Sequence, residues 1–268
     1  MNIITRTALR LAFKAAAHNS SELVRFMRKI GISSVSLETE FGALDIPTNS
    51  RSIIESFVRG AYFGRGVIEN FLNLKTEAKT IYNIGANVGT SAIRIAASGK
   101  YDSIHCYEPD PKNFEFLKRN TGRVGNLTCH EMAIGRNRGS LNLNLNNESV
   151  GRHSFRTDFG QGSVSVAVEA LDNIADRDEH FDIFMDVEGW EIEVLFGAAT
   201  CLPKCSVCAL EWNGQLHSKA QRQETAGLLR ESGFSSFVDL NLMDSRFDLS
   251  NLVEITEQKD LAFVKRPI

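Results

Sequence analysis

An alternation of short apolar segments with amphipathic ones, running from residue 80 to residue 265, constrains the fold of this sequence most strongly. The apolar segment TIYNI (80–84) precedes a helical pattern that Thr90 begins and Gly99 ends. Further apolar segments of strand length lie at 103–108, 126–134, 181–186, 206–212, 234–240 and 260–265. Strands that alternate with helices pack as a parallel sheet with helices on both faces. We therefore predict an α/β fold with a mostly parallel sheet of about seven strands.

The alternation is interrupted between the third and fourth of these strands. The segments LNLNLN (141–146) and VSVAV (164–168) alternate apolar and polar residues with a period of two. This period predicts an antiparallel hairpin or an extension of the sheet. Residues 147–162 between them are polar and contain several glycines, so we expect a mobile loop.

The residues before the first strand form a separate region. We predict an N-terminal extension of helices and a hairpin over 1–75, followed by the main α/β domain over 76–268. Residues 35–47 are predicted to form the hairpin, with its turn near Phe41 and Gly42. The extension is a candidate cap over the substrate.

The first 21 residues carry three basic side chains and no acid, interleaved with apolar residues. Such a segment is typical of an amphipathic helix that docks on its own domain, although a transit peptide or a helix in peripheral contact with a membrane has the same pattern. No apolar run approaches the ~20 residues that span a bilayer. A net charge of −3 does not favour nucleic-acid binding, and five cysteines, an odd number, suit a reducing compartment. We expect a cytoplasmic protein.

The loop after the first strand is a candidate ligand site. Its backbone turns through Gly85-Ala86-Asn87-Val88-Gly89 into a helix, and Glu108 lies 23 residues after Gly85 at the tip of the next strand. A carboxylate there can accept hydrogen bonds from both ribose hydroxyls of a nucleoside. The pattern G-x-G-x-x-G of dinucleotide sites lacks two of its three glycines here, which favours a ligand without a pyrophosphate, such as S-adenosylmethionine. A nicotinamide-dependent Rossmann oxidoreductase is the alternative.

Four segments together resemble the FkbM family of S-adenosylmethionine-dependent methyltransferases. They are NIGANVGTSA, YEPDPKNFEFLKRN, MAIG and DVEGWEIEVLFGA, within a region of about residues 35–240. The resemblance implies a class I methyltransferase fold, which is Rossmann-like. It also implies transfer of a methyl group from S-adenosylmethionine to a hydroxyl of a sugar, a polyketide or another small metabolite.

The resemblance also implies roles for individual residues. Glu108 would bind the ribose, Pro109 would shape the turn after it, and Met132 would border the adenine. Asp186 and Glu188 would lie under the methyl-transfer cavity. The cofactor loop would comprise Asn83, Gly85, Ala86, Asn87 and Gly89. The family usually has Asp at the position of Asn83 and Lys at the position of Phe184. These two differences keep open a relative that binds the cofactor with weakened catalysis.

Methyl transfer to a hydroxyl also needs a group that removes the proton. Asp186 and Glu188 are candidates if burial raises their pKa, and His153 in the predicted loop is a third. His217 is a weaker candidate. A Mg²⁺ ion held by Asp186, Glu211 and Asn213 could assist, but the residue pattern is not that of metal-dependent methyltransferases and we assign no metal site.

Two other sets of residues have alternative interpretations. Cys201, Cys205 and Cys208 have a spacing that includes no nearby fourth zinc ligand, so we interpret them as packed thiols. Trp190 and Trp212 could stack on the acceptor or belong to the core. The sequence does not predict an oligomeric state.

Overall fold

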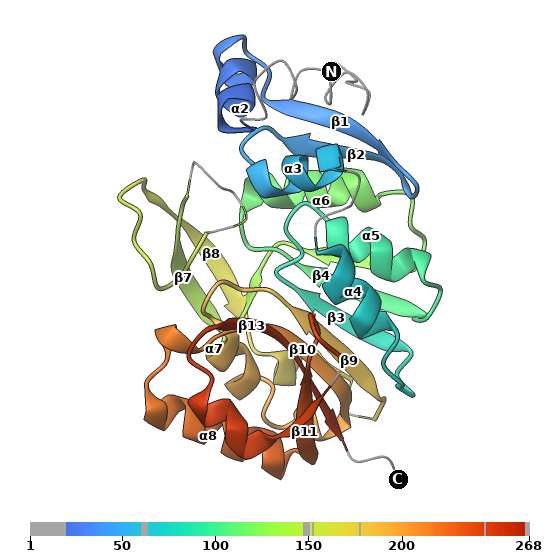
Figure 1. Cartoon of the computed structure of the whole chain (residues 1–268), viewed down its shortest axis with the longest axis vertical. Helices are drawn as coiled ribbons and strands as arrows, with labels where there is room; N and C mark the ends of the chain where they lie inside the picture. The colour runs from blue at the N-terminus through green and yellow to red at the C-terminus, as the bar shows by residue number, and fades with distance from the viewer. Residues whose placement is uncertain are drawn as a thin grey trace.

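The computed structural model describes residues 20–59, 64–146, 151, 153–176, 178–243 and 245–265. The basic segment before residue 20 therefore lies outside the described residues. An eight-stranded sheet forms the centre of the protein, in the spatial order β12-β11-β13-β10-β9-β3-β4-β5 (Figure 1). Its strands are β3 (Thr80–Ile84), β4 (Ser103–Tyr107), β5 (Leu127–His130), β9 (Phe181–Met185), β10 (Cys205–Asn213), β11 (Phe234–Asp239), β12 (Arg246–Asp248) and β13 (Gln258–Lys265).

The strand directions bring the candidate ligand residues to one edge of this sheet. β3 runs parallel to β4 and to β9, and Ile84 at its end pairs with Tyr107 and Met185 at theirs. The loops after these three strands therefore start side by side. β3 is the point at which the strand order reverses, and ligands of doubly wound sheets bind there. Within this sheet, β12 and β13 run in the direction opposite to the other six strands.

Helices cover both faces of the sheet. One face packs on α4 (Arg65–Leu72), α5 (Thr90–Ala97) and α6 (Pro111–Thr121) through buried apolar residues such as Phe71, Ile95 and Leu117. The other face packs on α7 (Glu191–Phe196), α8 (Lys219–Glu231) and η5 (Leu249–Glu254), with Ile192 and Leu229 in the core. The short 3₁₀ helices are η2 (Leu171–Asn173), η3 (Leu202–Lys204) and η4 (Gly214–Leu216).

The described part of the N-terminal region packs against the helix layer above the ligand edge (Figure 1). It contains α2 (Ser20–Lys29), the hairpin of β1 (Ser34–Thr39) and β2 (Gly42–Pro47), and α3 (Arg51–Arg59). Asn120 of α6 ties the hairpin down: it accepts the N–H of Asp45 at 2.8 Å and donates to the carbonyls of Asp45 and Val88 at 2.9 and 2.8 Å. The region has its own apolar cluster, which includes Leu37, Ile46 and Ile54.

A second, three-stranded sheet follows β5. It contains β6 (Ala133–Ile134), β7 (Gly139–Asn144) and β8 (Ser163–Glu169), with β7 antiparallel to β8. The predicted interruption of the βα alternation and its hairpin are thus confirmed. The strand predicted over 126–134 is wrong in one respect: it breaks after His130, and Ala133 and Ile134 pair with β8 instead of β4.

The predicted hairpin over 35–47 is also confirmed, with Thr39 paired to Gly42 across its turn. The prediction of about seven strands missed β12, a three-residue edge strand. Its residues Arg246, Phe247 and Asp248 are all exposed, so no hydrophobic pattern marks it. Among the helices that the structure describes, none is long and apolar enough to cross a bilayer.

Candidate functional site

The loop between β3 and α5 has a conformation that few side chains permit. Gly85 has a φ of 80°, and a Cβ atom added there would lie 1.9 Å from the carbonyl oxygen of Asp186. Asn87 has a φ of 50°, in the left-handed region that Asn tolerates better than most residues. The N–H groups of Gly85 and Ala86 both donate to the carbonyl of Tyr107 at 2.9 Å, which holds the loop against the end of β4.

The carboxylate of Glu108 is fixed by the same loop. One oxygen, Oε2, accepts the N–H of Asn87 at 2.9 Å, and the other, Oε1, accepts the N–H of Asp110 at 2.9 Å. Burial raises the pKa of Glu108 to about 7, although both hydrogen bonds favour the charged form. Each oxygen keeps a further lone pair with which it can accept a hydroxyl.

Glu108 lines a narrow cavity at the ends of β3, β4 and β9. Apolar side chains, including Ile134, Leu143 and Trp190, form most of its wall. Phe155 packs on Trp190 with ring centroids 5.0 Å apart. A narrow, mostly apolar cavity whose lining includes a carboxylate is a candidate site for a nucleoside. Buried polar atoms without a hydrogen-bond partner among the described residues include Asn87 Oδ1 and Trp190 Nε1, and both residues line the cavity.

A wide cleft of about 960 Å³ adjoins this cavity. Gly85, Asn87, Asp186 and Glu188 line both spaces, so the two meet at the ends of β3 and β9. The N-terminal region forms one wall of the cleft, with Ser50, Ile53 and other residues of α3. The ends of the central strands form another.

An acidic cluster of three residues lies where the cavity and the cleft meet. Asp186, Glu188 and Glu211 each have a carboxylate oxygen within 4.8 Å of those of the other two. Burial, and then the charges of Glu211 and Glu188, raise the pKa of Asp186 well above its usual value. Burial and the charge of Glu188 raise the pKa of Glu211 to about 7. The cluster therefore holds protons near neutral pH and attracts cations.

Buried polar residues hold the Asp186–Gly189 turn in position. Glu188 has a φ of 49° and Gly189 a φ of 92°, so this turn is locally strained. Glu191 Oε1 accepts the N–H of Gly189 at 2.7 Å, and Ser154 Oγ donates to the carbonyl of Glu188 at 3.2 Å. Both contacts fix the backbone beside the acidic cluster.

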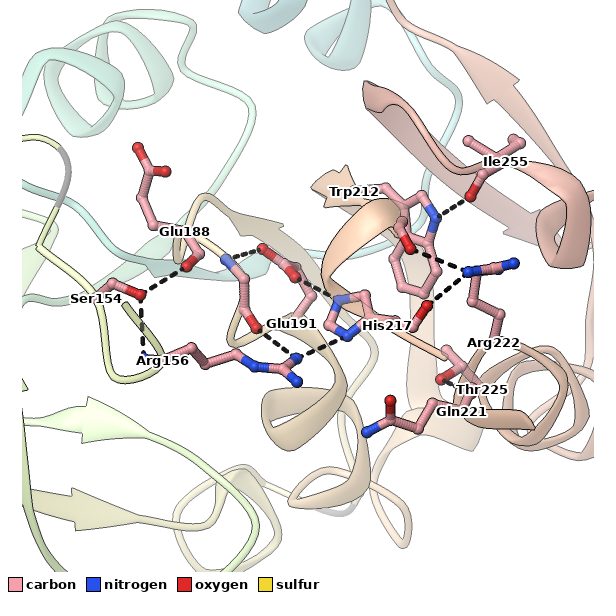
Figure 2. Close-up of polar contacts among 12 residues, drawn as sticks. Ser154, Arg156, Glu188, Glu191, Trp212, His217, Gln221, Arg222, Thr225 and Ile255 are labelled. Atoms are coloured by element: carbon pink, nitrogen blue, oxygen red, sulfur yellow. Dashed lines mark hydrogen bonds and ion pairs between the residues drawn. The ribbon is translucent and has the colours of Figure 1, made fainter. Parts of the chain in front are cut away.

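The fully buried Glu191 continues into a chain of polar contacts (Figure 2). Its Oε2 lies 3.2 Å from His217 Nε2, and His217 Nδ1 lies 2.9 Å from Arg156 Nη1. Because an Arg can only donate, Nδ1 accepts and Nε2 carries the proton. Arg222 Nη1 donates to the carbonyl of His217 at 2.6 Å, and Trp212 packs against the imidazole ring with centroids 5.0 Å apart. Residues 154–156 are thereby docked on the turn.

The structure brings most of the predicted site residues together. Gly85, Asn87, Glu108, Pro109, Met132, His153, Asp186 and Glu188 line the narrow cavity, and Ala86 lines the cleft. Asn83 and Gly89 line neither space. The buried amide of Asn83 donates to Ser91 Oγ at 3.0 Å and so supports the start of α5 from below. Gly89 permits close packing, since a Cβ there would lie 3.1 Å from Leu117 Cδ1.

The histidines occupy different places from those the sequence suggested. His153 lines the narrow cavity: its Nδ1 accepts the N–H of Asn146 at 2.8 Å, and its Nε2 lies 3.6 Å from Asp110 Oδ2. His217, a candidate base by sequence, is buried behind the turn and lines neither space. Its Nε2 contacts Glu191, its Nδ1 contacts Arg156, and its ring packs against Trp212. This position does not favour His217 as the base.

The structure also distinguishes between the alternative interpretations of the tryptophans and the cysteines. Trp212 is fully buried and donates to the carbonyl of Ile255 at 3.3 Å, so it belongs to the core, whereas Trp190 lines the nucleoside cavity. Cys201, Cys205 and Cys208 are buried in the apolar core as free thiols, as interpreted from their spacing.

Sequence reasoning missed several residues of the site. Asn113 and Tyr107 line the nucleoside cavity, and Arg25, Ser50, Arg51 and Asp260 line the cleft. Asn113 follows the N-cap Asp110 by three residues, and that spacing could have placed it at the cavity. The N-terminal residues carry no comparable signal, because they reach the cleft only through the packing of the hairpin on α6.

Comparisons with known proteins identify the family of this chain. The model of the methyltransferase FkbM domain matches residues 83–239. The hexuronic acid methyltransferase AglP of Haloferax volcanii is 22% identical over 173 residues, 63% of this chain and 69% of that protein. The 2-O-methyltransferase NoeI of Sinorhizobium fredii is 25% identical over 154 residues, 50% of this chain and 63% of that protein, just under two thirds of its length. Among solved structures, a TehB-like SAM-dependent methyltransferase from Corynebacterium glutamicum aligns over 78% of this chain and 91% of that one, with a TM-score of 0.43 and 10% identity.

The mostly parallel eight-stranded sheet with helices on both faces is a class I methyltransferase fold. More particularly, since the family model spans more than half of it, the chain belongs to the FkbM methyltransferase family.

Proposed function

We propose that this protein transfers a methyl group from S-adenosylmethionine to a hydroxyl oxygen of a sugar or another small metabolite. The observation that carries the proposal is the junction of the nucleoside cavity and the wide cleft. Gly85, Asn87, Asp186 and Glu188 line both, so a cofactor in the one presents its reactive end to an acceptor in the other. Holding two reactants in line supplies much of the rate of such a displacement.

The residues of the narrow cavity fit the adenosine part of the cofactor. Glu108 would accept both ribose hydroxyls, and its orientation is already fixed by two backbone N–H groups. Met132 and Ile134 would border the adenine. His153, between Asp110 and the N–H of Asn146, closes the ribose end, so in this proposal it binds and does not act as the base.

The acidic cluster fits the charged end of the cofactor. Bound S-adenosylmethionine supplies an electrophilic methyl group on a positively charged sulfur. Asp186, Glu188 and Glu211 provide the negative potential that a cation requires in a partly desolvated site. Asn83, which replaces the usual acid of the family, lies below the loop and outside both spaces, so the potential does not depend on it.

The same cluster would accept the proton of the acceptor hydroxyl. A general base is most effective when its pKa lies near the working pH. Burial and neighbouring carboxylates raise the pKa of Asp186, which directly follows β9 and lines both spaces. We assign the proton to Asp186, with Glu188 and Glu211 sharing the charge.

The relatives support a sugar acceptor. One carries the name of a hexuronic acid methyltransferase and the other that of a 2-O-methyltransferase. A wide cleft lined by carboxylates, amides and hydroxyls, including Asn146, Gln258 and Ser50, suits a polyhydroxylated ligand.

A mass-shift screen of hydroxylated acceptors with S-adenosylmethionine tests the proposal. We expect a product heavier by one methylene group and stoichiometric S-adenosylhomocysteine. Asp186→Asn should lower kcat at least ~100-fold, the usual size of a lost general base, with affinity for S-adenosylhomocysteine unchanged within about threefold. Full activity of Asp186→Asn would refute the assignment of the proton.

A further inference from the structure

The start of α3 forms a part of the cleft that the proposed reaction does not use. Ser50, Arg51, Ser52 and Ile53 all line the cleft there, together with Arg25 of α2. The first N–H groups of a helix have no partner within the helix, and the helix dipole makes that end positive. The first turn of α3 carries no acidic residue. This end of the cleft therefore favours an anion.

Ser50 provides an independent indication of a ligand. Its side chain is 2% exposed, and its Oγ has no hydrogen-bond partner among the residues that the structure describes. The backbone of Ser50 is satisfied, since its N–H donates to Pro47 and its carbonyl accepts from Ile54. A serine that precedes a helix usually caps it with its own oxygen. Here the hydroxyl belongs to a residue that lines the cleft and has no partner among the described residues, and a buried hydroxyl without a partner is unfavourable.

Positively and negatively charged side chains line different parts of the cleft. The cationic side chains among the described lining residues are Arg25 and Arg51, both in the N-terminal wall. Arg51 Nε also donates to Glu55 in that wall at 2.7 Å, so the two arginines and this one carboxylate leave a net positive charge there. At the sheet ends the cleft is lined by Asp186, Glu188, Glu211 and Asp260. An acceptor with an anionic group would therefore bind in one orientation, with that group at α3 and a hydroxyl toward the carboxylates.

We propose that the start of α3, with the Ser50 hydroxyl, the first N–H groups of the helix and the side chain of Arg51, binds an anionic group of the acceptor, a carboxylate or a phosphate. This inference rests on the proposed function, because the ligand is the acceptor of the same cleft. It also predicts that neutral sugars are poor acceptors, because they lack the anionic group that this site would bind.

The test measures binding of small probes to the protein saturated with S-adenosylhomocysteine, by ligand-observed nuclear magnetic resonance. The probes are glucuronate, glucose 6-phosphate, inorganic phosphate and glucose. We expect glucuronate or glucose 6-phosphate to bind at least ~10-fold more tightly than glucose, and the better of the two identifies the anionic group. Binding of inorganic phosphate alone would support the anion site as well. Equal binding of glucose, or no binding of any anion, would overturn the inference.

Variants of α3 locate the site. Ser50→Ala and Arg51→Gln should each weaken binding of the anionic probe ~10-fold, whereas Ser56→Ala should have no effect. Ser56 is the matched control because its hydroxyl donates to Ser52 within the same helix. Ser50→Ala removes an unsatisfied hydroxyl, so its melting temperature should equal or exceed that of the wild type; unchanged probe binding in this variant would refute the site.

Failure of this inference can be distinguished from failure of the proposed function. If S-adenosylhomocysteine itself does not bind, the proposed function is wrong and the anion site loses its basis. If it binds and the probes do not distinguish charge, only the anion site is wrong.

Discussion

Replacing Glu108 with Gln perturbs the contact on which the nucleoside assignment depends. In the wild type each carboxylate oxygen accepts one backbone N–H at 2.9 Å and keeps a lone pair for a ribose hydroxyl. An amide has one oxygen, so one ribose hydroxyl loses its acceptor. A hydrogen bond to a charged group contributes about 1.5–3 kcal/mol, which corresponds to roughly 10–150-fold in the affinity for S-adenosylhomocysteine.

The pH dependence gives this prediction a second signature. Because the pKa of Glu108 in the free protein is about 7, and ribose hydroxyls bind the carboxylate form, affinity should rise with pH through that value. Binding at pH 6 should be ~10-fold weaker than at pH 8, because at pH 6 most Glu108 side chains are protonated and must lose that proton when the ligand binds. In the Gln variant this dependence on Glu108 is lost.

Isothermal titration calorimetry with S-adenosylhomocysteine at pH 6, 7 and 8 measures both effects. Glu131→Gln is the matched control, because Glu131 is exposed, lies beside Met132 and does not line either space. Affinity of Glu108→Gln within twofold of wild type at pH 8, with the control also unchanged, would refute the ribose assignment.

Three further predictions follow from the acidic cluster and the buried histidine. The pKa of Glu211 is raised from its usual 4.5 to about 7, so its contribution to the free energy of unfolding should be largest below pH 4.5 and fall by up to about 3 kcal/mol as the pH rises through 7. Urea unfolding of Glu211→Gln should lack this component of the pH profile, and a profile identical to that of the wild type would contradict it. S-adenosylmethionine is cationic and S-adenosylhomocysteine is not, so ionisation of the acidic cluster should favour the former. The affinity for S-adenosylmethionine relative to that for S-adenosylhomocysteine should therefore increase at least ~3-fold from pH 6 to pH 8. A constant ratio in calorimetry would exclude this role of the cluster. His217→Ala removes the donor to the fully buried Glu191 Oε2 and should lower the free energy of unfolding by about 1.5–3 kcal/mol in urea, whereas the exposed His180→Ala should not; equal stabilities would show that the pair is not structural.

The central sheet and the nucleoside loop could be predicted from the sequence because both have local signals. Strand and helix periods alternate along the chain, and Gly85 and Glu108 are separated by one βα unit. The left-handed φ of Gly85 and its approach to Asp186 explain why a glycine is needed there. These features depend on residues that are close in sequence or on the regular register of parallel strands.

The cleft and its contacts could not be predicted in this way. Ser50 and Arg25 reach the site only because Asn120 fastens the hairpin to α6, a contact across 75 residues of chain. The role of His217 depends equally on packing, since its partner Glu191 is 26 residues away and both are buried. A histidine at a strand end has the same local sequence whether it faces the ligand or the core.

Calorimetric titration of the wild-type protein with S-adenosylhomocysteine and, separately, with NAD tests whether the narrow cavity binds the methyltransferase cofactor. We expect one molecule of S-adenosylhomocysteine bound per chain at micromolar concentrations, and no binding of NAD at millimolar concentrations. Binding of NAD without binding of S-adenosylhomocysteine would contradict this expectation.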